Sequence, residues 1–159
     1  MKKIILFFLA LCTLISCDKE DIYTPVPNYI DLQIPSNFPD LEYDLSKNPL
    51  TDEGVALGKK LFYEGRLASD NVIACGFCHE QASAFTHHGH DVSHGIKDRL
   101  GTRNALPVMN MAWGNQFFWD GGVFDLDFVA INAITSHVEM DETIPNVLTK
   151  LRSYPEYPP

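Results

Sequence analysis

One five-residue motif, Cys75-Gly76-Phe77-Cys78-His79, constrains the fold of this chain more than any other feature. Two thiols at this spacing can add to the two vinyl groups of one haem, and the histidine that follows can ligate the haem iron. The motif therefore predicts one covalently bound haem c, attached through Cys75 and Cys78 and ligated by His79.

A Cys-x-x-Cys pair also occurs in zinc sites and in thioredoxin-like proteins. A structural zinc site needs four ligands, and the 159 residues contain no second pair of this kind. A thioredoxin-like motif follows a strand of a βαβ unit, and the sequence shows no pattern of that kind. Haem attachment is therefore favoured, because a histidine follows the pair at once and an export signal precedes it.

The export signal occupies residues 1–16. Lys2 and Lys3 precede a mostly apolar run over residues 4–15, which is shorter than the roughly 20 residues of a bilayer span. Such a run is typical of a cleaved signal peptide. Its removal would change the formal charge from −9 to −11, because both lysines are lost with it.

The signal ends in Leu14-Ile15-Ser16-Cys17, which resembles the lipobox of bacterial lipoproteins. Cys17 is then the lipidated first residue, and its acyl chains anchor the protein to a membrane surface. An ordinary signal peptide with an incidental cysteine is the alternative. Residues 18–21, Asp-Lys-Glu-Asp, resemble a surface-export signal. We expect an outer-membrane lipoprotein of a Gram-negative bacterium that faces the periplasm or the cell exterior.

The strongly acidic composition limits the partners. An acidic surface repels the phosphate backbone, so the sequence argues against nucleic-acid binding. It favours a basic partner, such as a small electron-carrier protein with a lysine rim.

The remaining chain divides into a proline-rich acidic tether over residues 17–47 and a domain over residues 48–159. Within the tether, Ile30, Leu32 and Ile34 alternate and predict a strand-like arm that docks on the domain. Helices are expected over residues 52–63, 124–134 and about 141–153, with Thr51 and Asp141 as N-caps. No strand pattern competes with them, so the predicted class is all-α.

Residues 81–125 are rich in Gly, His, Asn and Asp and have little periodicity. They predict a long irregular loop that uses the haem as its hydrophobic support. Four histidines lie there: His87, His88, His90 and His94. They form either a metal site of their own or a solvated polar loop.

Several further stretches between residues 48 and about 153 form an ordered set with the haem motif. They are Asn48-Pro49-Leu50-Thr51, Leu57-Gly58-Lys59-Lys60-Leu61-Phe62, Arg66-Leu67-Ala68-Ser69-Asp70, Gly101-Thr102-Arg103-Asn104-Ala105, Phe118-Trp119-Asp120-Gly121-Gly122 and Val138-Glu139-Met140. As a set they resemble the N-terminal half of the di-haem cytochrome c peroxidase family, which includes the MauG-type enzymes. The resemblance implies a cytochrome c-like haem domain with long irregular loops.

The resemblance also implies a role for individual residues. His79 would be the proximal ligand of the peroxidatic haem, and His94 would be its distal ligand, with His90 or His88 as alternatives. Trp119 would carry electrons between two haems, and Asn104 would help to bind calcium. Glu139 follows Trp119 by twenty residues, as the catalytic glutamate of the family does, and would act on the peroxide.

The sequence departs from the family pattern at three points. Val129 stands where many members have a glutamine, and Gly122 stands where the Trp-Asp-Gly-Arg motif has its arginine. The second half of the family, with another Cys-x-x-Cys-His and an axial methionine, is also absent from these 159 residues. We therefore expect a truncated sequence or a separately encoded second haem domain.

The expected function is the reduction of hydrogen peroxide to water, with electrons from a small c-type cytochrome or cupredoxin through the second haem domain. A mono-haem electron-transfer lipoprotein, in which His94 or a methionine permanently fills the sixth iron position, is the main alternative. A haem-binding or assembly fragment without turnover, or a histidine-rich metal-binding module, is a third.

Overall fold

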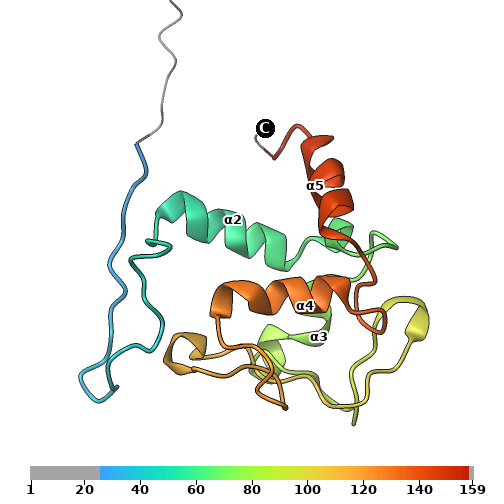
Figure 1. Cartoon of the computed structure of the whole chain (residues 1–159), viewed down its shortest axis with the longest axis horizontal. Helices are drawn as coiled ribbons and strands as arrows, with labels where there is room; N and C mark the ends of the chain where they lie inside the picture. The colour runs from blue at the N-terminus through green and yellow to red at the C-terminus, as the bar shows by residue number, and fades with distance from the viewer. Residues whose placement is uncertain (1–25, 158–159) are drawn as a thin grey trace, which may run out of the picture.

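The structure is a computed structural model that describes residues 26–157 (Figure 1). The predicted signal peptide over residues 1–16 and the predicted lipidation site at Cys17 lie outside the described residues. The α-helices are α2 (Asp52–Phe62), α3 (Cys75–Cys78), α4 (Val129–Thr135) and α5 (Ile144–Arg152). Short 3-10 turns occur at Gly65–Leu67, Gln81–Ser83, Ile96–Asp98, Met111–Trp113 and Leu126–Phe128. No helix in the described part of the chain is long and apolar enough to cross a membrane.

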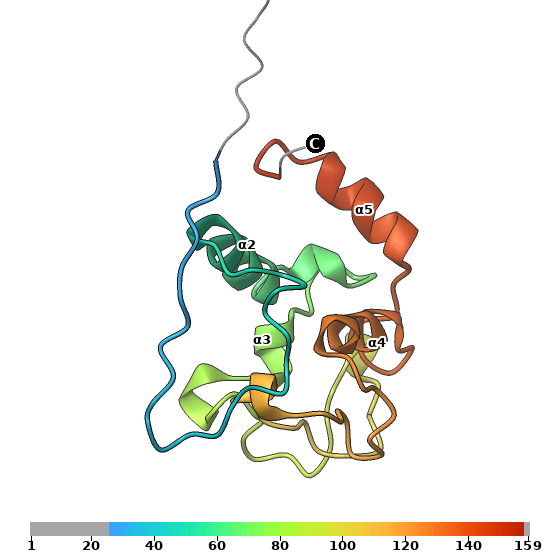
Figure 2. The same ribbon diagram turned by 60° about the vertical axis from the view of Figure 1, so that its left-hand side comes forward.

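The predicted all-α class is confirmed. Within residues 26–157, extended segments meet only as isolated bridges, such as those between Glu80 and Thr86, His94 and Leu100, and Phe117 and Val123. In Figures 1 and 2 the long irregular segment lies at one end of the molecule, while α2 and α5 lie at the other end. The predicted irregular loop over residues 81–125 therefore exists, and it is held by turns and bridges.

Helix α2 forms for the reasons that its sequence predicts. The Thr51 hydroxyl accepts a hydrogen bond from the Gly54 backbone N–H at 2.9 Å, which satisfies one free donor of the first turn. Asp52 and Glu53 lie at the positive end of the helix dipole and Lys59 lies at the negative end.

The hydrophobic core joins segments that are far apart in sequence. Its buried members are Leu67, Ala68, Ile96, Ile134, Met140 and Val147. They come from the turn after α2, the irregular segment, α4, the turn after α4, and α5. Lys150 of α5 also pairs with the buried Glu142 at 2.8 Å and donates to the Ala68 carbonyl at 2.6 Å. Helix α5 is thus fixed by packing and by a hydrogen-bonded ion pair.

Two helix boundaries differ from the prediction. Helix α4 begins at Val129 rather than at residue 124, and Phe124 is 71% exposed. The N-cap of α5 is Thr143, not Asp141, and the Thr143 hydroxyl accepts from the Asn146 N–H. Asp141 instead has a φ of 49° and pairs with Arg99 at 2.7 Å. Asp141, which the sequence predicts as the N-cap of α5, therefore forms a tertiary ion pair with Arg99 instead.

The C-terminal residues fold back onto the end of α2. The Tyr157 hydroxyl donates to the buried Glu64 at 2.6 Å, and the Arg66 Nε donates to the same carboxylate at 2.7 Å. Arg66 also pairs with Glu156 at 2.8 Å and lies 3.9 Å from the centroid of the Tyr154 ring. We call these five residues the Arg66 clamp.

The described part of the predicted tether, from residue 26 to residue 47, runs along one side of the domain (Figure 2). Tyr29 forms a bridge with Thr51, the Trp113 Nε1 donates to the Pro39 carbonyl at 2.9 Å, and the Tyr43 hydroxyl donates to Asp127 at 2.9 Å. The part of the segment around Pro39 and Tyr43 is thus docked on the domain. The strand-like arm predicted at Ile30, Leu32 and Ile34 is wrong, because these residues form no strand and Leu32 and Ile34 are exposed. The division into tether and domain at residue 48 stays a prediction.

Candidate haem site

The haem motif forms the short helix α3. The His79 N–H donates to the Cys75 carbonyl at 3.0 Å, so the whole motif occupies one helical turn. A side chain at Gly76 would place its Cβ 2.6 Å from the Tyr63 ring, so with any other residue the Tyr63 ring would have to move for α3 to approach the end of α2 this closely. The packing of Gly76 on Tyr63 therefore orients the two thiols and the histidine.

His79 is prepared as a metal ligand by its backbone partner. Its Nδ1 donates to the Phe85 carbonyl at 3.1 Å, which places the lone pair of the neutral ring on Nε2. Burial lowers the pKa of His79 and so favours the neutral imidazole. Two half-buried thiols and one imidazole with its lone pair on Nε2 fit the donor set that a covalent haem requires.

Glu139 lies beside the two motif cysteines. Burial raises the pKa of Cys75 and of Cys78, and the negative charge of Glu139 raises both further. Burial also raises the pKa of Glu139 itself. The Cys78 Sγ also donates to the His94 carbonyl at 3.4 Å, and the adjoining Gly95 meets the Glu139 backbone. The fold therefore brings a residue sixty positions along the chain near the haem motif.

The turn that carries Glu139 is fixed by the segment around His94. The Ile96 N–H donates to the Glu139 carbonyl at 2.8 Å, and Ile96 is fully buried. A Cβ at Gly95 would lie 2.6 Å from the Cα of Glu139 and would overlap the Val138 carbonyl oxygen. Glycine at position 95 is thus required for the two backbones to meet.

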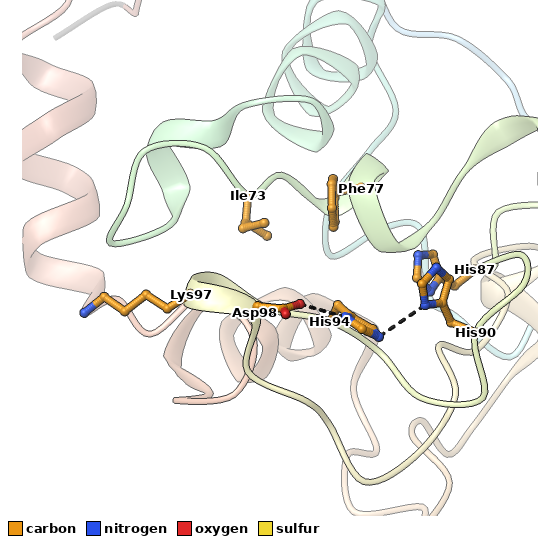
Figure 3. A pocket seen from close by; sticks show the side chains of 8 residues that line it. Ile73, Phe77, His87, His90, His94, Lys97 and Asp98 are labelled. Carbon is orange, nitrogen blue, oxygen red and sulfur yellow. Dashed lines mark hydrogen bonds and ion pairs between the residues drawn. The ribbon is translucent and has the colours of Figure 1, made fainter.

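A cavity of about 240 Å³ opens between the haem motif and the His94 segment (Figure 3). Its lining residues are Ile73, Phe77, His87, His90, His94, Gly95, Lys97 and Asp98. One wall is apolar, with Ile73 and Phe77, and the other carries the histidines. Such a cavity joins the apolar surface that a porphyrin needs to polar groups that can serve bound peroxide.

The His94 imidazole is held on both ring nitrogens. Its Nδ1 lies 3.0 Å from an Asp98 carboxylate oxygen and its Nε2 lies 3.2 Å from Nδ1 of His90 (Figure 3). The His90 ring stacks on His87 at 4.6 Å, and the buried Nδ1 of His87 has no hydrogen-bond partner. His88 is exposed. Across residues 26–157, no group of three or more His, Cys, Asp or Glu is arranged to hold a metal ion by itself.

Trp119 and Asn104 are brought together. The Trp119 Nε1 donates to the Asn104 carbonyl at 2.9 Å, and Arg103 pairs with Asp120 at 2.6 Å. The Asn104 amide donates to the His90 carbonyl at 2.8 Å, which links Trp119 to the histidine cluster. The indole remains 60% exposed, so its face is available to a further group.

Two features of the site escape sequence reasoning. The bond from His79 to the Phe85 carbonyl involves a backbone atom, and the close approach of Gly95 to the Glu139 turn depends on the tertiary fold. The Asp98 contact is different, because His90, His94 and Asp98 follow one another at four-residue spacing. That spacing was a readable signal.

The comparisons with known proteins agree on one family. The family model described as di-haem cytochrome c peroxidase matches residues 52–159. The methylamine utilization protein MauG of Methylorubrum extorquens is 36% identical over 118 residues, a match that covers 70% of this chain and 31% of that protein. The cytochrome c551 peroxidase of Pseudomonas aeruginosa is 35% identical over 124 residues, with coverage of 75% and 34%. The chain thus spans about a third of the length of these relatives.

The fold agrees as well. A crystal structure of a MauG-like protein associated with microbial copper homeostasis superposes with a TM-score of 0.72 at 26% identity, and the match covers 80% of this chain and 38% of that one. The family model matches more than half of the chain, and its matched region contains the haem motif, Trp119 and Glu139. This chain therefore belongs to the di-haem cytochrome c peroxidase family.

Proposed function

We propose that this chain forms the peroxide-reducing haem domain of a di-haem peroxidase, which reduces hydrogen peroxide to two waters with two electrons and two protons. The position of Glu139 is the observation that carries the proposal. A half-buried carboxyl group whose pKa is raised by burial lies near the thiols that would bind the haem. Carboxyl groups with shifted pKa values beside a cleft are typical of functional sites.

The chemistry of peroxide cleavage explains the need for this carboxylate. A haem bound at Cys75, Cys78 and His79 would supply the iron that binds peroxide and stores oxidising equivalents. Heterolysis of the O–O bond requires a proton to leave the oxygen nearest the iron and another to reach the far oxygen. Glu139 can accept the first proton and donate it to the far oxygen, and its raised pKa suits both transfers near neutral pH.

The other site residues receive roles that depend on this proposal. His94 would occupy the sixth iron position at rest and leave to admit peroxide. Trp119 would pass electrons from a second haem domain, which fits its exposed indole. Asn104 would contribute to a calcium site near Trp119. The electron donor would be a small c-type cytochrome or cupredoxin.

The location of the protein is also part of the proposal. The apolar run and the lipobox-like sequence before Cys17 support export and a lipid anchor on a membrane surface, facing the periplasm or the cell exterior. Mass spectrometry of the mature N-terminus tests this directly. We expect residues 1–16 to be absent and acyl chains to be present on Cys17, and an unprocessed N-terminus would contradict the assignment.

The experiment that tests the function is rapid mixing of the reduced, haem-loaded chain with hydrogen peroxide. We expect Glu139→Gln to slow peroxide cleavage about a hundredfold or more, with haem content unchanged. Glu42→Gln, which changes an exposed carboxylate of the docked arm, is the matched control and should react like the parent chain.

Two outcomes would count against the proposal. Unchanged kinetics in Glu139→Gln would remove this residue from the mechanism. A chain that stays six-coordinate and low-spin after reduction, and does not react with peroxide, would instead be a mono-haem electron-transfer protein.

A further inference from the structure

We propose that His90 competes with the haem iron for the Nε2 of His94, while Asp98 holds the Nδ1 of His94 whether or not that residue ligates the iron. His90 and Asp98 are then positioning residues with opposite effects on the sixth iron position. This inference rests on the proposed role of His94 as the distal ligand.

The hydrogen bonds define the state of the His94 ring. An ionised carboxylate only accepts hydrogen bonds, so the contact of 3.0 Å to Asp98 places the proton of a neutral His94 on Nδ1. The lone pair is then on Nε2, where the Nδ1–H of His90 donates to it at 3.2 Å. The atom that would bind iron is therefore occupied by His90 in this arrangement.

The backbone that carries His94 is fixed on both sides. The Ser93 N–H donates to the Arg103 carbonyl at 3.0 Å, the Gly95 N–H donates to the Arg99 carbonyl at 2.8 Å, and the adjoining Ile96 is anchored in the core. These contacts hold the main chain on both sides of His94, so a change of partner at Nε2 would involve the side chains of His94 and Asp98 and not a shift of the backbone. The cavity of about 240 Å³ in front of the ring gives it room (Figure 3).

The competing His90 is itself held in place. Its ring stacks on His87 at 4.6 Å with an interplanar angle of 21°, and its carbonyl accepts from the Asn104 amide at 2.8 Å. It therefore offers Nδ1 to His94 from a fixed position. Asp98 differs from His90, because it contacts the Nδ1 of His94 and does not compete for the Nε2 of His94. A carboxylate on the far nitrogen also makes a histidine a better metal ligand.

Two substitutions test the two halves of the proposal. His90→Phe keeps an aromatic ring on His87 but removes the donor to His94. Asp98→Gly removes the carboxylate, and glycine accepts the positive φ of 56° at this position. His137→Phe, at an exposed histidine that does not line the cavity, and Asp91→Gly, at an exposed position near His90, are matched controls.

The measurement is the fraction of six-coordinate low-spin haem in the oxidised, haem-loaded chain, from optical absorption and electron paramagnetic resonance. We expect the ratio of low-spin to high-spin haem to rise about two- to fivefold in His90→Phe and to fall by a similar factor in Asp98→Gly. The controls should match the parent chain. Equal ratios in all variants would overturn the proposal. A shift of the ratio in the same direction in His90→Phe and in Asp98→Gly would also overturn it.

His94→Ala separates this inference from the function on which it rests. If His94→Ala abolishes the low-spin signal while His90→Phe has no effect, then His94 is the distal ligand and only the competition is disproved. If His94→Ala leaves the low-spin signal intact, the distal assignment itself is wrong and the competition falls with it. Circular dichroism of each variant confirms that the helices are retained.

Discussion

The helical end of the molecule and its irregular end are held together by different interactions. Helices α4 and α5, the turn after α2 and the turn after α4 supply five of the six residues of the buried apolar core, and the buried Glu142 pairs there with Lys150. The irregular segment supplies only Ile96 and Phe117 as buried apolar residues among those described. It depends on isolated bridges, on side-chain bonds to backbone carbonyls, and on residues with positive φ such as Phe85 and Asp98.

This difference separates the part of the domain that provides stability from the part that carries most of the site residues. Most of the candidate site residues lie on the irregular end, where the backbone can take the conformations that a site requires. Glu139 is the exception, since it follows α4 and belongs to the helical end. The contact between Ile96 and the Glu139 turn joins the two ends. The following predictions test this contrast, from the largest expected effect to the smallest.

Removal of the haem should increase backbone amide exchange more at the irregular end of the molecule than at the helical end. We expect the double variant Cys75→Ala, Cys78→Ala to lose all covalent haem, because no thiol of the motif remains. Backbone amides of residues 81–125 should then exchange with solvent roughly tenfold faster or more, while those of α2 and α5 change less. Hydrogen-exchange mass spectrometry measures both regions in one sample. An equal increase at both ends would show that the haem supports the whole domain.

Ile96, the fully buried residue of the irregular segment, should contribute more to stability than the exposed apolar residues of that segment. Ile96→Ala should lower the free energy of unfolding by about 2–5 kcal/mol, because Ile96 is 0% exposed and a cavity would remain. Leu100→Ala, at a side chain that is 55% exposed, is the matched control and should change it by about 0.5 kcal/mol or less. Urea denaturation measures both, and similar losses would refute the anchoring role of Ile96.

Because of the Arg66 clamp, the free energy of unfolding should fall in acid. Arg66 above all, and then Tyr157, hold the pKa of Glu64 at about 2, below its ordinary value of 4.5. The unfolded chain therefore binds the proton first, so the stabilisation is complete above the ordinary value and is lost as the pH falls toward 2. Tyr157→Phe should lower the free energy of unfolding at pH 7 by about 1–2 kcal/mol.

The pH dependence of the free energy of unfolding is a second test of the Arg66 clamp. The slope between about pH 5 and pH 2 should be smaller in Glu64→Gln than in the parent chain, because one proton-linked group has been removed. An identical slope in the two proteins would show that Glu64 does not contribute.

The smallest expected effect has the opposite sign. Gly58 lies inside α2, and a Cβ there would meet no atom of the described residues within 4 Å. Gly58→Ala should therefore raise the free energy of unfolding by up to about 1 kcal/mol, since alanine is the better helix former. Thermal unfolding checks this. A loss of stability would indicate that a part of the protein outside residues 26–157 packs against Gly58.

Local sequence patterns determined much of this protein. Thr51 and the acidic first turn predict α2, and the motif ending in His79 predicts the haem site, because caps and covalent attachment depend on near neighbours. The family resemblance of residues 48 to about 153 could also be read from short ordered motifs. The role of Glu139 came from that resemblance, not from its local sequence.

Only the tertiary structure decided which distant groups meet. Asp141 pairs with Arg99 and does not cap α5, the Glu139 charge lies near Cys75 and Cys78, and the Asn104 amide reaches the His90 carbonyl. The reason is physical: helix starts and haem attachment depend on residues a few positions apart, whereas ion pairs, burial and ring contacts depend on separations in space that no local pattern encodes.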